Sequence, residues 1–332
     1  MADVIIEARN LVKHFAIKIG FFKTLLARKE VPVVHAVEDV SFEIKKKEVF
    51  GLVGESGCGK TTTGRTVLRL IEPTSGKVLF HGQDITLLPH DEMQKLRRKM
   101  QIIFQDPYES LSPRMSTYDQ ISEPMRIQNV ANSEEEVEEG VSKVMEEMGL
   151  VPPEEYLYRF PHELSGGQRQ RVAIGRALVL NPEFIVADEP VSMLDASIRT
   201  DVSKLMLKLV STFDLSMLYI THDIALARYM CNRIAVMYLG KIVEKAPTED
   251  LIQKPLHPYT KALIAAVPVP DPTARRIEVT IGGQVPSPVN PPSGCMFHPR
   301  CPKAQEICRE KEPPLIEVDK VRFVACYFPE EK

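Results

Sequence analysis

Residues 54–61 carry the residue types that bind the phosphates of a nucleotide. They form the sequence GESGCGKT, which matches the spacing G-x-x-x-x-G-K-[ST]. The glycines let the backbone turn tightly and direct several N–H groups at one anion. Lys60 can reach the β- and γ-phosphates, and the hydroxyl of Thr61 can ligate Mg²⁺. We therefore expect nucleotide contacts from Gly54, Ser56, Gly57, Cys58, Gly59, Lys60, Thr61 and Thr62.

Two elements must position this loop. The apolar run 49–53 predicts a buried strand, and residues 62–70 are compatible with a helix. Strand, glycine loop and helix in this order support a phosphate-binding loop, because the positive end of the helix reinforces anion binding. Cys58, inside the loop, and Cys231 are interpreted as a small space-filling residue and a buried hydrophobic residue.

A second apolar run ends in two carboxylates. Residues 184–187 predict a buried strand, and Asp188 and Glu189 follow it. In a phosphate-loop protein, an aspartate at this place can hold Mg²⁺, directly or through water. The next carboxylate, Glu189, can orient or deprotonate an attacking water.

A second glycine pair opens another predicted helix. In the segment 164–168, LSGGQ, Ser165 is a plausible N-cap and Gly166 and Gly167 leave backbone N–H groups uncovered. Such a helix start is again a site for an anion. One nucleotide does not need two such sites in the same fold.

Composition restricts the class of protein. A chain of 332 residues with 44% hydrophobic and 26% charged residues is typical of a globular protein of about two domains. The net charge of -3 does not require a nucleic-acid partner, so none is expected. No apolar run approaches the roughly 18 residues of a membrane span, and the N-terminus does not have the form of a secretory signal. We therefore expect a cytosolic protein.

The order of predicted elements indicates an α/β fold. Strands are expected at 4–11, 37–44, 77–85, 101–104, 184–187 and 216–220, with a hairpin at 234–238 and 241–245; residues 77–85 can also be a hairpin arm. Helices are expected at 91–99, 133–148, 167–179, 196–213 and 224–231. Because residues 106–161 contain helical patterns only, they predict a helical insertion. Alternating strands and helices elsewhere predict a mostly parallel sheet.

Two features near the N-terminus have two interpretations each. The segment 18–32 has basic and aromatic residues, which suits either a contact with a partner or membrane surface or a solvated loop. Phe15 can stack on a nucleotide base or belong to the core.

These motifs, in this order, resemble the nucleotide-binding subunit of ATP-binding-cassette (ABC) transporters over roughly residues 3–255. The resemblance implies a RecA-like phosphate-loop NTPase with an antiparallel β subdomain and a helical subdomain at about 106–165. It also implies that the loop 164–168 contacts the γ-phosphate of ATP held by another subunit.

The resemblance assigns roles to individual residues. Phe15 matches the aromatic residue that stacks on adenine. Gln105 matches the glutamine that ligates Mg²⁺, and His222 matches the switch histidine at the γ-phosphate. The remaining matches are the Walker B and catalytic carboxylates Asp188 and Glu189, the signature residues Ser165, Gly166, Gly167 and Gln168, and Asp195 in the D-loop, where Met193 stands at a position often held by alanine.

Beyond residue 255 the chain is proline-rich, and residues 284–294 predict an extended linker. We expect a cassette at 1–255 and a small irregular metal-binding module at 256–332. Cys295, Cys301, Cys308 and Cys326 can close around one metal centre, and their spacing suits an iron–sulfur cluster better than zinc. The alternatives are zinc, with or without His298, and uncoordinated thiols. The sequence KPLHPYT at 254–260 resembles peptide- and nickel-importer ATPases, whose similar tails imply a four-iron, four-sulfur cluster.

The expected function is ATP hydrolysis that energises import of dipeptides or oligopeptides. The resemblance implies a head-to-tail dimer, made with a copy or a paralogue, at the cytoplasmic face of the membrane. It implies permease subunits that contact the helical subdomain and, indirectly, an extracytoplasmic peptide-binding protein. The alternatives are an importer ATPase for nickel or another substrate, a soluble ABC ATPase of translation or DNA repair, and a regulatory nucleotide-binding module.

Overall fold

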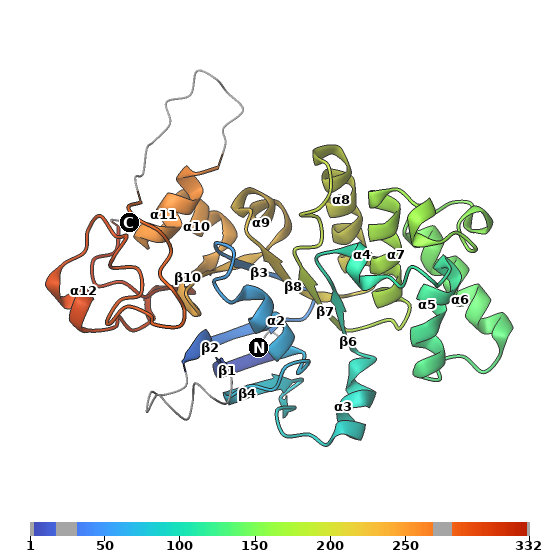
Figure 1. Ribbon diagram of the computed structural model, residues 1–332, viewed down its shortest axis with the longest axis horizontal. Coiled ribbons are helices and arrows are strands. Elements are labelled where there is room, and N and C mark those ends of the chain that lie inside the picture. The colour runs from blue at the N-terminus through green and yellow to red at the C-terminus, as the bar shows by residue number, and fades with distance from the viewer. Residues whose placement is uncertain (1–2, 18–31, 268–280, 331–332) are drawn as a thin grey trace, which may run out of the picture. The chain divides into compact units, whose positions relative to one another are not determined.

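The computed structural model describes residues 3–17, 32–267 and 281–330 (Figure 1). Contacts divide them into two units, which are described separately. The phosphate-loop unit contains residues 6–17, 32–43, 50–86, 221–267 and 281–330. The signature-loop unit contains residues 3–5, 44–49 and 87–220. Residues 18–31 of the basic and aromatic segment lie outside the described residues.

The phosphate-loop unit contains a four-stranded sheet in the order β2-β1-β4-β5. Its strands are β1 (Val4–Ala16), β2 (Val33–Lys45), β4 (Ser75–Phe80) and β5 (Gln83–Asp84). β4 pairs antiparallel with both β1 and β5. A tight turn joins β4 to β5, with φ of 49° at His81 and 77° at Gly82, as the right-handed twist of a hairpin favours. The sequence expectation of a hairpin arm at 77–85 is thus confirmed.

A second set of strands in this unit follows the order β11-β12-β10-β9-β3. β3 (Val49–Val53) pairs parallel with β9 (Arg233–Tyr238), and β9 forms the predicted hairpin with β10 (Lys241–Pro247). The helices are α2 (Lys60–Val67), α9 (Ile224–Met230), α10 (Thr248–Gln253), α11 (Pro258–Ala265) and α12 (Glu306–Glu310).

The C-terminal region is more regular than the sequence predicts. β12 (Arg322–Val324) pairs antiparallel with β10 and with β11 (Ile316–Asp319). The buried carboxylate of Glu244 on β10 accepts hydrogen bonds from the backbone N–H groups of Leu256 and His257, each at 2.9 Å. The chain after residue 255 therefore continues the sheet of this unit, because its short strands find their hydrogen-bond partners there.

The signature-loop unit contains three parallel strands in the order β8-β7-β6, with bounds Ser216–Thr221, Phe184–Asp188 and Met100–Ile103. Every residue of β7 and β8 is buried, as the continuous apolar runs of the sequence require. The helices are α3 (His90–Arg97), α4 (Pro107–Ser110), α5 (Thr117–Ile127), α6 (Glu134–Glu147), α7 (Gly166–Leu178) and α8 (Ala196–Thr212), with short 3₁₀ turns at Pro153–Glu155 and Pro161–Glu163.

The predicted helical insertion is present. Helices α5, α6 and α7 pack against one another (Figure 1). On α6, Val137, Val141, Val144 and Met145 are buried, at the spacing of one helix face. Ser116 and Ser133 cap α5 and α6 by accepting hydrogen bonds from backbone N–H groups three residues later.

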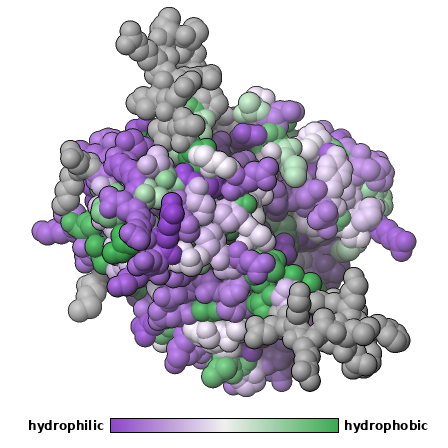
Figure 2. Space-filling view, turned by 60° about the vertical axis from the view of Figure 1, so that its left-hand side comes forward, coloured by the Kyte–Doolittle hydropathy of each residue, from purple (hydrophilic) through white to green (hydrophobic). Residues whose placement is uncertain are grey.

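The fold class is therefore α/β with a mixed sheet, which corrects the expectation of a mostly parallel one. The antiparallel pairings in this sheet are those made by β10, β11 and β12. Two of these strands, β11 and β12, lie beyond residue 255. The face shown in Figure 2 is mainly hydrophilic, with hydrophobic residues in small groups. Among the described helices, none has the length and apolarity that crossing a membrane requires.

Candidate functional site

The phosphate loop connects β3 to α2. Gly59 is the N-cap of α2 with φ of 104°, and Gly57 has φ of 78°, so both adopt a backbone conformation that favours glycine. A Cβ atom on Gly54 would lie 2.2 Å from the carbonyl oxygen of Met237. The loop therefore needs glycine at these positions for conformation or for space.

Lys60 is held inside this loop. Its side chain is buried, and its ammonium donates hydrogen bonds to the carbonyl oxygens of Gly54 at 2.8 Å and Glu55 at 3.0 Å. Cys58 is also buried, and burial raises the pKa of its thiol. Cys231 lies in the core, where its Sγ would be 2.8 Å from a Cβ on Gly51. The interpretation of both cysteines as packing residues agrees with these positions.

The sequence does not predict how Glu55 is held. Arg300 forms two hydrogen bonds with its carboxylate, at 2.9 and 3.1 Å. The backbone N–H of Glu55 donates to the hydroxyl of the buried Tyr259 at 3.0 Å. Glu55 occupies a variable position of the loop motif, so the motif alone gives no signal for these contacts.

The signature-loop unit brings Gln105 and Glu189 together. Gln105 follows β6 and Glu189 follows the neighbouring parallel strand β7. The amide of Gln105 donates to the carboxylate of Glu189 at 3.3 Å. Asp188, the last residue of β7, is buried. Glu189 has φ of 47°, and its backbone N–H donates to the carbonyl of Ile220 at 2.9 Å. A non-glycine residue in this conformation is often found at functional sites.

The signature loop begins α7 with a capping box. The backbone N–H of Gln168 donates to the hydroxyl of Ser165 at 3.3 Å, and the N–H of Ser165 donates to the Gln168 side chain at 2.9 Å. Ser165 is exposed, Gly166 is half-buried, and Gly167 is buried against Ile198 of α8, whose Cγ2 would lie 2.7 Å from a Cβ. The helix start thus combines an exposed hydroxyl with a glycine that permits close packing.

Three further predicted site residues lie at exposed places. Asp195 is the exposed N-cap residue of α8, and His222 is exposed between β8 and α9. Phe15 on β1 is 38% exposed, and the ammonium of Lys13 lies 4.9 Å from its ring centroid. This exposure contradicts the alternative in which Phe15 is a core residue. Phe15, the phosphate loop and His222 belong to the phosphate-loop unit, and the other predicted nucleotide residues belong to the signature-loop unit.

The four C-terminal cysteines line one small cavity. Cys295, Cys301, Cys308 and Cys326 share it with His298 and Phe297, among other residues. Burial raises the pKa of Cys326 to about 11, and the other three thiols add to this shift. All six cysteines of the chain are free. Cysteines separated by up to 31 positions in the sequence therefore line the same cavity, and metal binding by them stays a prediction.

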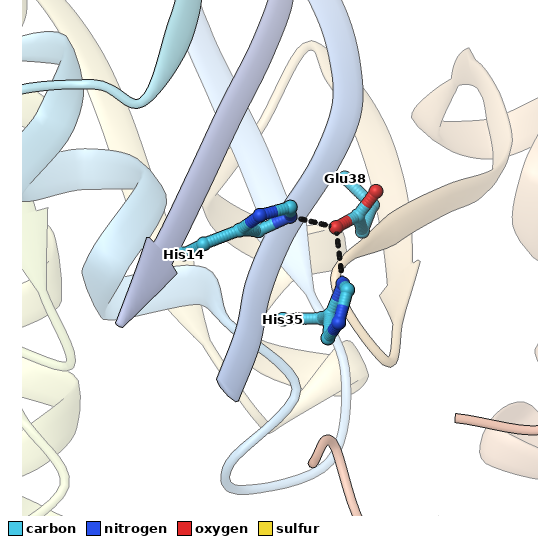
Figure 3. Close-up of side chains that lie close together, drawn as sticks. All are labelled: His14, His35 and Glu38. Atoms are coloured by element: carbon cyan, nitrogen blue, oxygen red, sulfur yellow. Dashed lines mark hydrogen bonds and ion pairs between the residues drawn. The ribbon is translucent and has the colours of Figure 1, made fainter. Parts of the chain in front are cut away.

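The sequence does not predict a cluster of two histidines and a glutamate that the structure contains. Figure 3 shows His14 on β1 and His35 and Glu38 on β2, with both imidazoles directed at the same carboxylate. One ligand atom from each of the three residues lies within 4.8 Å of the others. Their spacing in the sequence matches no metal-binding motif, so only the pairing of strands reveals them.

Comparison with known proteins places this geometry in a family. Residues 37–192 match the family model described as ABC transporter. Residues 243–308 match the model described as oligopeptide/dipeptide transporter, C-terminal region. A dimeric structure of an ATP-binding cassette, in a post-hydrolysis state with ADP and phosphate, aligns with a TM-score of 0.64 at 29% identity, covering 74% of this chain and 99% of that one.

Relatives extend over almost the whole chain. A probable peptide ABC transporter ATP-binding protein of Sinorhizobium fredii is 48% identical over 328 residues, which is 98% of this chain and 90% of the relative. The oligopeptide transport ATP-binding protein AppF of Bacillus subtilis is 46% identical over 98% of this chain and 97% of its own length. The chain therefore belongs to the ATP-binding subunits of ABC transporters, in the oligopeptide/dipeptide importer group.

Proposed function

We propose that this chain hydrolyses ATP to energise the import of dipeptides or oligopeptides through an ABC transporter. The observation that carries the proposal is the combination of a complete cassette with a C-terminal region of the oligopeptide/dipeptide type in one chain. Relatives described as peptide import ATP-binding proteins match 97% of the chain at 48% identity. Peptides are therefore the favoured cargo over nickel.

Each predicted site residue has a role in this reaction. Glu189 orients and polarises the attacking water, and its contact with Gln105 supports this assignment. Lys60 and His222 stabilise charge on the γ-phosphate, and Phe15 stacks on adenine. Mg²⁺, held by Thr61, Gln105 and Asp188, would neutralise phosphate charge when bound. The remaining phosphate contacts come from Gly54, Ser56, Gly57, Cys58, Gly59 and Thr62.

We infer that two cassettes close head to tail around two ATP molecules. Ser165, Gly166, Gly167 and Gln168 would contact the nucleotide of the neighbouring subunit, and Asp195 would lie at the same interface. The exposure of Ser165 and Asp195 supports this role, because side chains that act on another subunit must reach the surface. The similar solved cassette is described as dimeric.

The helical subdomain at about 106–165 is proposed to contact the permease subunits. It exposes five large hydrophobic side chains, which are Tyr108, Ile127, Val151, Tyr158 and Phe160. A protein partner would cover such side chains if they lie in one patch. The subdomain begins next to Gln105, so a partner there could respond to the state of the catalytic glutamate. The chain would then act at the cytoplasmic face of the membrane, with an extracytoplasmic peptide-binding protein as an indirect partner.

The region 256–332 is proposed to be a domain built around a four-iron, four-sulfur cluster held by the four cysteines, following a cassette at 1–255. Zinc with four thiolates would bring their sulfur atoms to about 3.8 Å from one another, given Zn–S bonds of about 2.3 Å. Within the described part of the chain, no three of these sulfurs lie within 4.8 Å of one another. A cluster with several irons spans a wider set of thiolates and therefore fits these residues better.

Two measurements test this function. Peptide uptake by a reconstituted transporter should require this subunit and ATP. Under the same conditions the transporter should take up no nickel. For the cluster, anaerobically purified protein should show broad visible absorbance and about four irons per chain, both lost in Cys326→Ser and retained in Cys231→Ser. Colourless, zinc-loaded wild-type protein would contradict the cluster and leave the ATPase assignment intact.

A further inference from the structure

His14, His35 and Glu38 converge on one point between β1 and β2 (Figure 3). His35 Nδ1 lies 2.7 Å from Glu38 Oε1, and His14 Nε2 also contacts this oxygen. The two imidazole rings are 4.4 Å apart between centroids and tilted by 56°. Three potential ligand atoms thus meet within 4.8 Å, although no two of these residues are adjacent in the sequence.

The backbone fixes all three residues independently. The N–H of His14 donates to the hydroxyl of Thr74 at 3.0 Å. The N–H of His35 donates to the carbonyl of Pro288 at 3.0 Å, and that of Glu38 donates to the carbonyl of Gly240 at 2.9 Å. Three separate segments of the phosphate-loop unit therefore hold the cluster in place. These hydrogen bonds fix the backbone from which the three side chains extend.

The side chains are open enough for an ion to enter. Exposed fractions are 29% for His14, 33% for His35 and 21% for Glu38. Glu38 supplies a carboxylate oxygen that a ring nitrogen of each histidine already approaches. A metal-binding imidazole offers the lone pair of an unprotonated ring nitrogen.

The donor set selects the class of ion. Ca²⁺ and Mg²⁺ prefer sets of oxygen ligands, and this cluster offers one carboxylate. Two imidazole nitrogens and one carboxylate oxygen are a ligand set found in zinc sites, in which water takes the fourth position. Imidazole also suits copper, iron and nickel. We propose that His14 Nε2, His35 Nδ1 and a Glu38 oxygen bind one divalent transition-metal ion of the zinc type.

The test must separate this site from the C-terminal cysteines, which are themselves proposed to hold a metal centre. The full chain is dialysed against excess Zn²⁺, and bound zinc per chain is compared among wild type, His35→Ala, Glu38→Gln and the control His90→Ala, whose histidine is exposed on α3. Wild type and the control should bind one equivalent more than the other two variants. Zn²⁺ should also raise the unfolding temperature of wild type more than that of Glu38→Gln, because binding stabilises the folded state.

Equal zinc content in wild type and both cluster variants would overturn the site and leave a hydrogen-bonded His–Glu–His cluster. Loss of zinc in His35→Ala alone, with Glu38→Gln unchanged, would also overturn the three-ligand arrangement. Circular dichroism identifies a variant that fails to fold. The zinc content of the other cluster variant then decides whether the site exists.

Both the carboxylate and the backbone N–H of Glu55 are held by other side chains. Arg300 holds both oxygens of this carboxylate, at 2.9 and 3.1 Å, and the Arg300 side chain is only 9% exposed. Paired hydrogen bonds between guanidinium and carboxylate are strong and directional. Tyr259 holds the backbone of the same residue from a second direction. Both contacts come from the chain beyond residue 255.

The contacting residues are themselves rigidly packed. The rings of Tyr238, Tyr259 and Phe297 lie 4.8 to 5.4 Å apart between centroids, in edge-on or tilted pairs. Such pairs favour fixed ring positions. The guanidinium of Arg300 lies 5.8 Å from the Tyr238 centroid. A phosphate-loop residue is thus attached to a well-packed part of the phosphate-loop unit.

Glu55 also contacts the cation of the loop, since its carbonyl oxygen accepts a hydrogen bond from Lys60. We infer that Arg300 and Tyr259 are positioning residues that keep the phosphate loop in its nucleotide-binding conformation. This inference rests on the proposed ATPase function. It gives the C-terminal region a part in ATP binding, whether or not the cysteines hold a cluster.

Steady-state ATPase measurements test it. Arg300→Gln and Glu55→Gln should each raise KM for ATP about tenfold, a loss of about 1.4 kcal/mol of binding, with a smaller change in kcat. Arg309→Gln, an exposed arginine in the same region, should match wild type. The double variant should be little worse than either single one, because both remove the same pair.

Unchanged KM in folded Arg300→Gln and Glu55→Gln would overturn the inference while wild-type hydrolysis still supported the proposed function. Absence of hydrolysis in wild type would instead contradict that function. If Arg300→Gln does not fold, Glu55→Gln decides, since Glu55 lies on the loop and its side chain is 28% exposed.

Discussion

The side-chain amide of Gln105 donates a hydrogen bond to the carboxylate of Glu189 at 3.3 Å. The two residues follow adjacent parallel strands, β6 and β7, in which Ile103 lies opposite Ala187. The polar residues that follow parallel strands therefore meet at one edge of the sheet. Two residues after Gln105, the chain enters α4.

Gln105→Ala tests the value of this contact. Removing the amide takes away one partner of the Glu189 carboxylate and one proposed Mg²⁺ ligand, so kcat for ATP hydrolysis should fall about tenfold or more. KM should change less, because the phosphate loop is untouched. Gln253→Ala, which removes an exposed glutamine from α10, is the matched control. A kcat equal to that of wild type would contradict the role of Gln105.

Ser165→Ala separates stability from function at the signature loop. Ser165 and Ser133 are both N-cap residues that accept a hydrogen bond from a backbone N–H, at 3.3 and 3.2 Å. Either alanine variant should cost about 1 kcal/mol in the free energy of unfolding. Only Ser165→Ala should also reduce ATPase activity and ATP-dependent dimerisation, since Ser133 caps α6 and has no proposed nucleotide contact. Equal activity of the two variants would argue against a nucleotide contact from Ser165.

Two glycines of the phosphate loop should respond differently to alanine. A Cβ on Gly54 would lie 2.2 Å from the Met237 carbonyl oxygen, whereas a Cβ on Gly57 meets nothing within 4 Å. Gly54→Ala should therefore distort the loop, destabilise the protein by about 1–3 kcal/mol and abolish ATP binding. For Gly57→Ala, only the φ of 78° disfavours alanine. This variant should lose about 1–2 kcal/mol in the free energy of unfolding and keep measurable ATP binding. Urea unfolding and nucleotide titration check both, and tighter ATP binding by Gly54→Ala than by Gly57→Ala would refute this account.

The buried His257 predicts loss of stability in acid. Burial lowers its pKa to about 3, and its Nδ1 accepts a hydrogen bond from the N–H of Tyr259. The unfolded chain takes up a proton near pH 6.5 that the folded chain does not, so stability falls as pH decreases below 6.5. The contribution of this residue is about 1.4 kcal/mol at pH 5.5.

Glu244 has the opposite effect on the pH dependence of stability. Burial raises its pKa despite hydrogen bonds from Leu256 and His257, so its contribution to stability increases as pH decreases. The informative quantity is therefore the difference between wild type and His257→Asn, which keeps a hydrogen-bond acceptor but does not titrate. The free energy of unfolding of the variant should change less between pH 7.5 and 5.5. An identical pH dependence in the two proteins would contradict a neutral buried His257.

Sequence predicts those parts of the structure that local patterns determine. The fully buried strands β7 and β8 follow from continuous apolar runs, and α6 follows from its helical spacing of apolar residues. The phosphate loop follows from its glycines, whose positive φ values the structure confirms at Gly57 and Gly59. Each of these features depends on residues close together in the chain.

Long-range contacts could not be predicted in this way. Arg300 and Glu55 are 245 positions apart, and no periodicity connects them. The three residues of β12 are too few for a pattern, yet their pairing with β10 changes the sheet from mostly parallel to mixed. His14 and Glu38 meet because β1 and β2 are neighbours in the sheet, which their separate sequences do not specify.

In the proposed mechanism, hydrolysis depends on Glu189 within a closed dimer of cassettes. The most direct measurement combines light scattering with single-turnover hydrolysis for Glu189→Gln, with Glu109→Gln, an exposed glutamate, as control. Glu189→Gln should form a stable ATP-bound dimer and hydrolyse ATP at least about 100-fold more slowly than wild type. Hydrolysis at the wild-type rate by Glu189→Gln, or a variant that stays monomeric with ATP bound, would contradict the account.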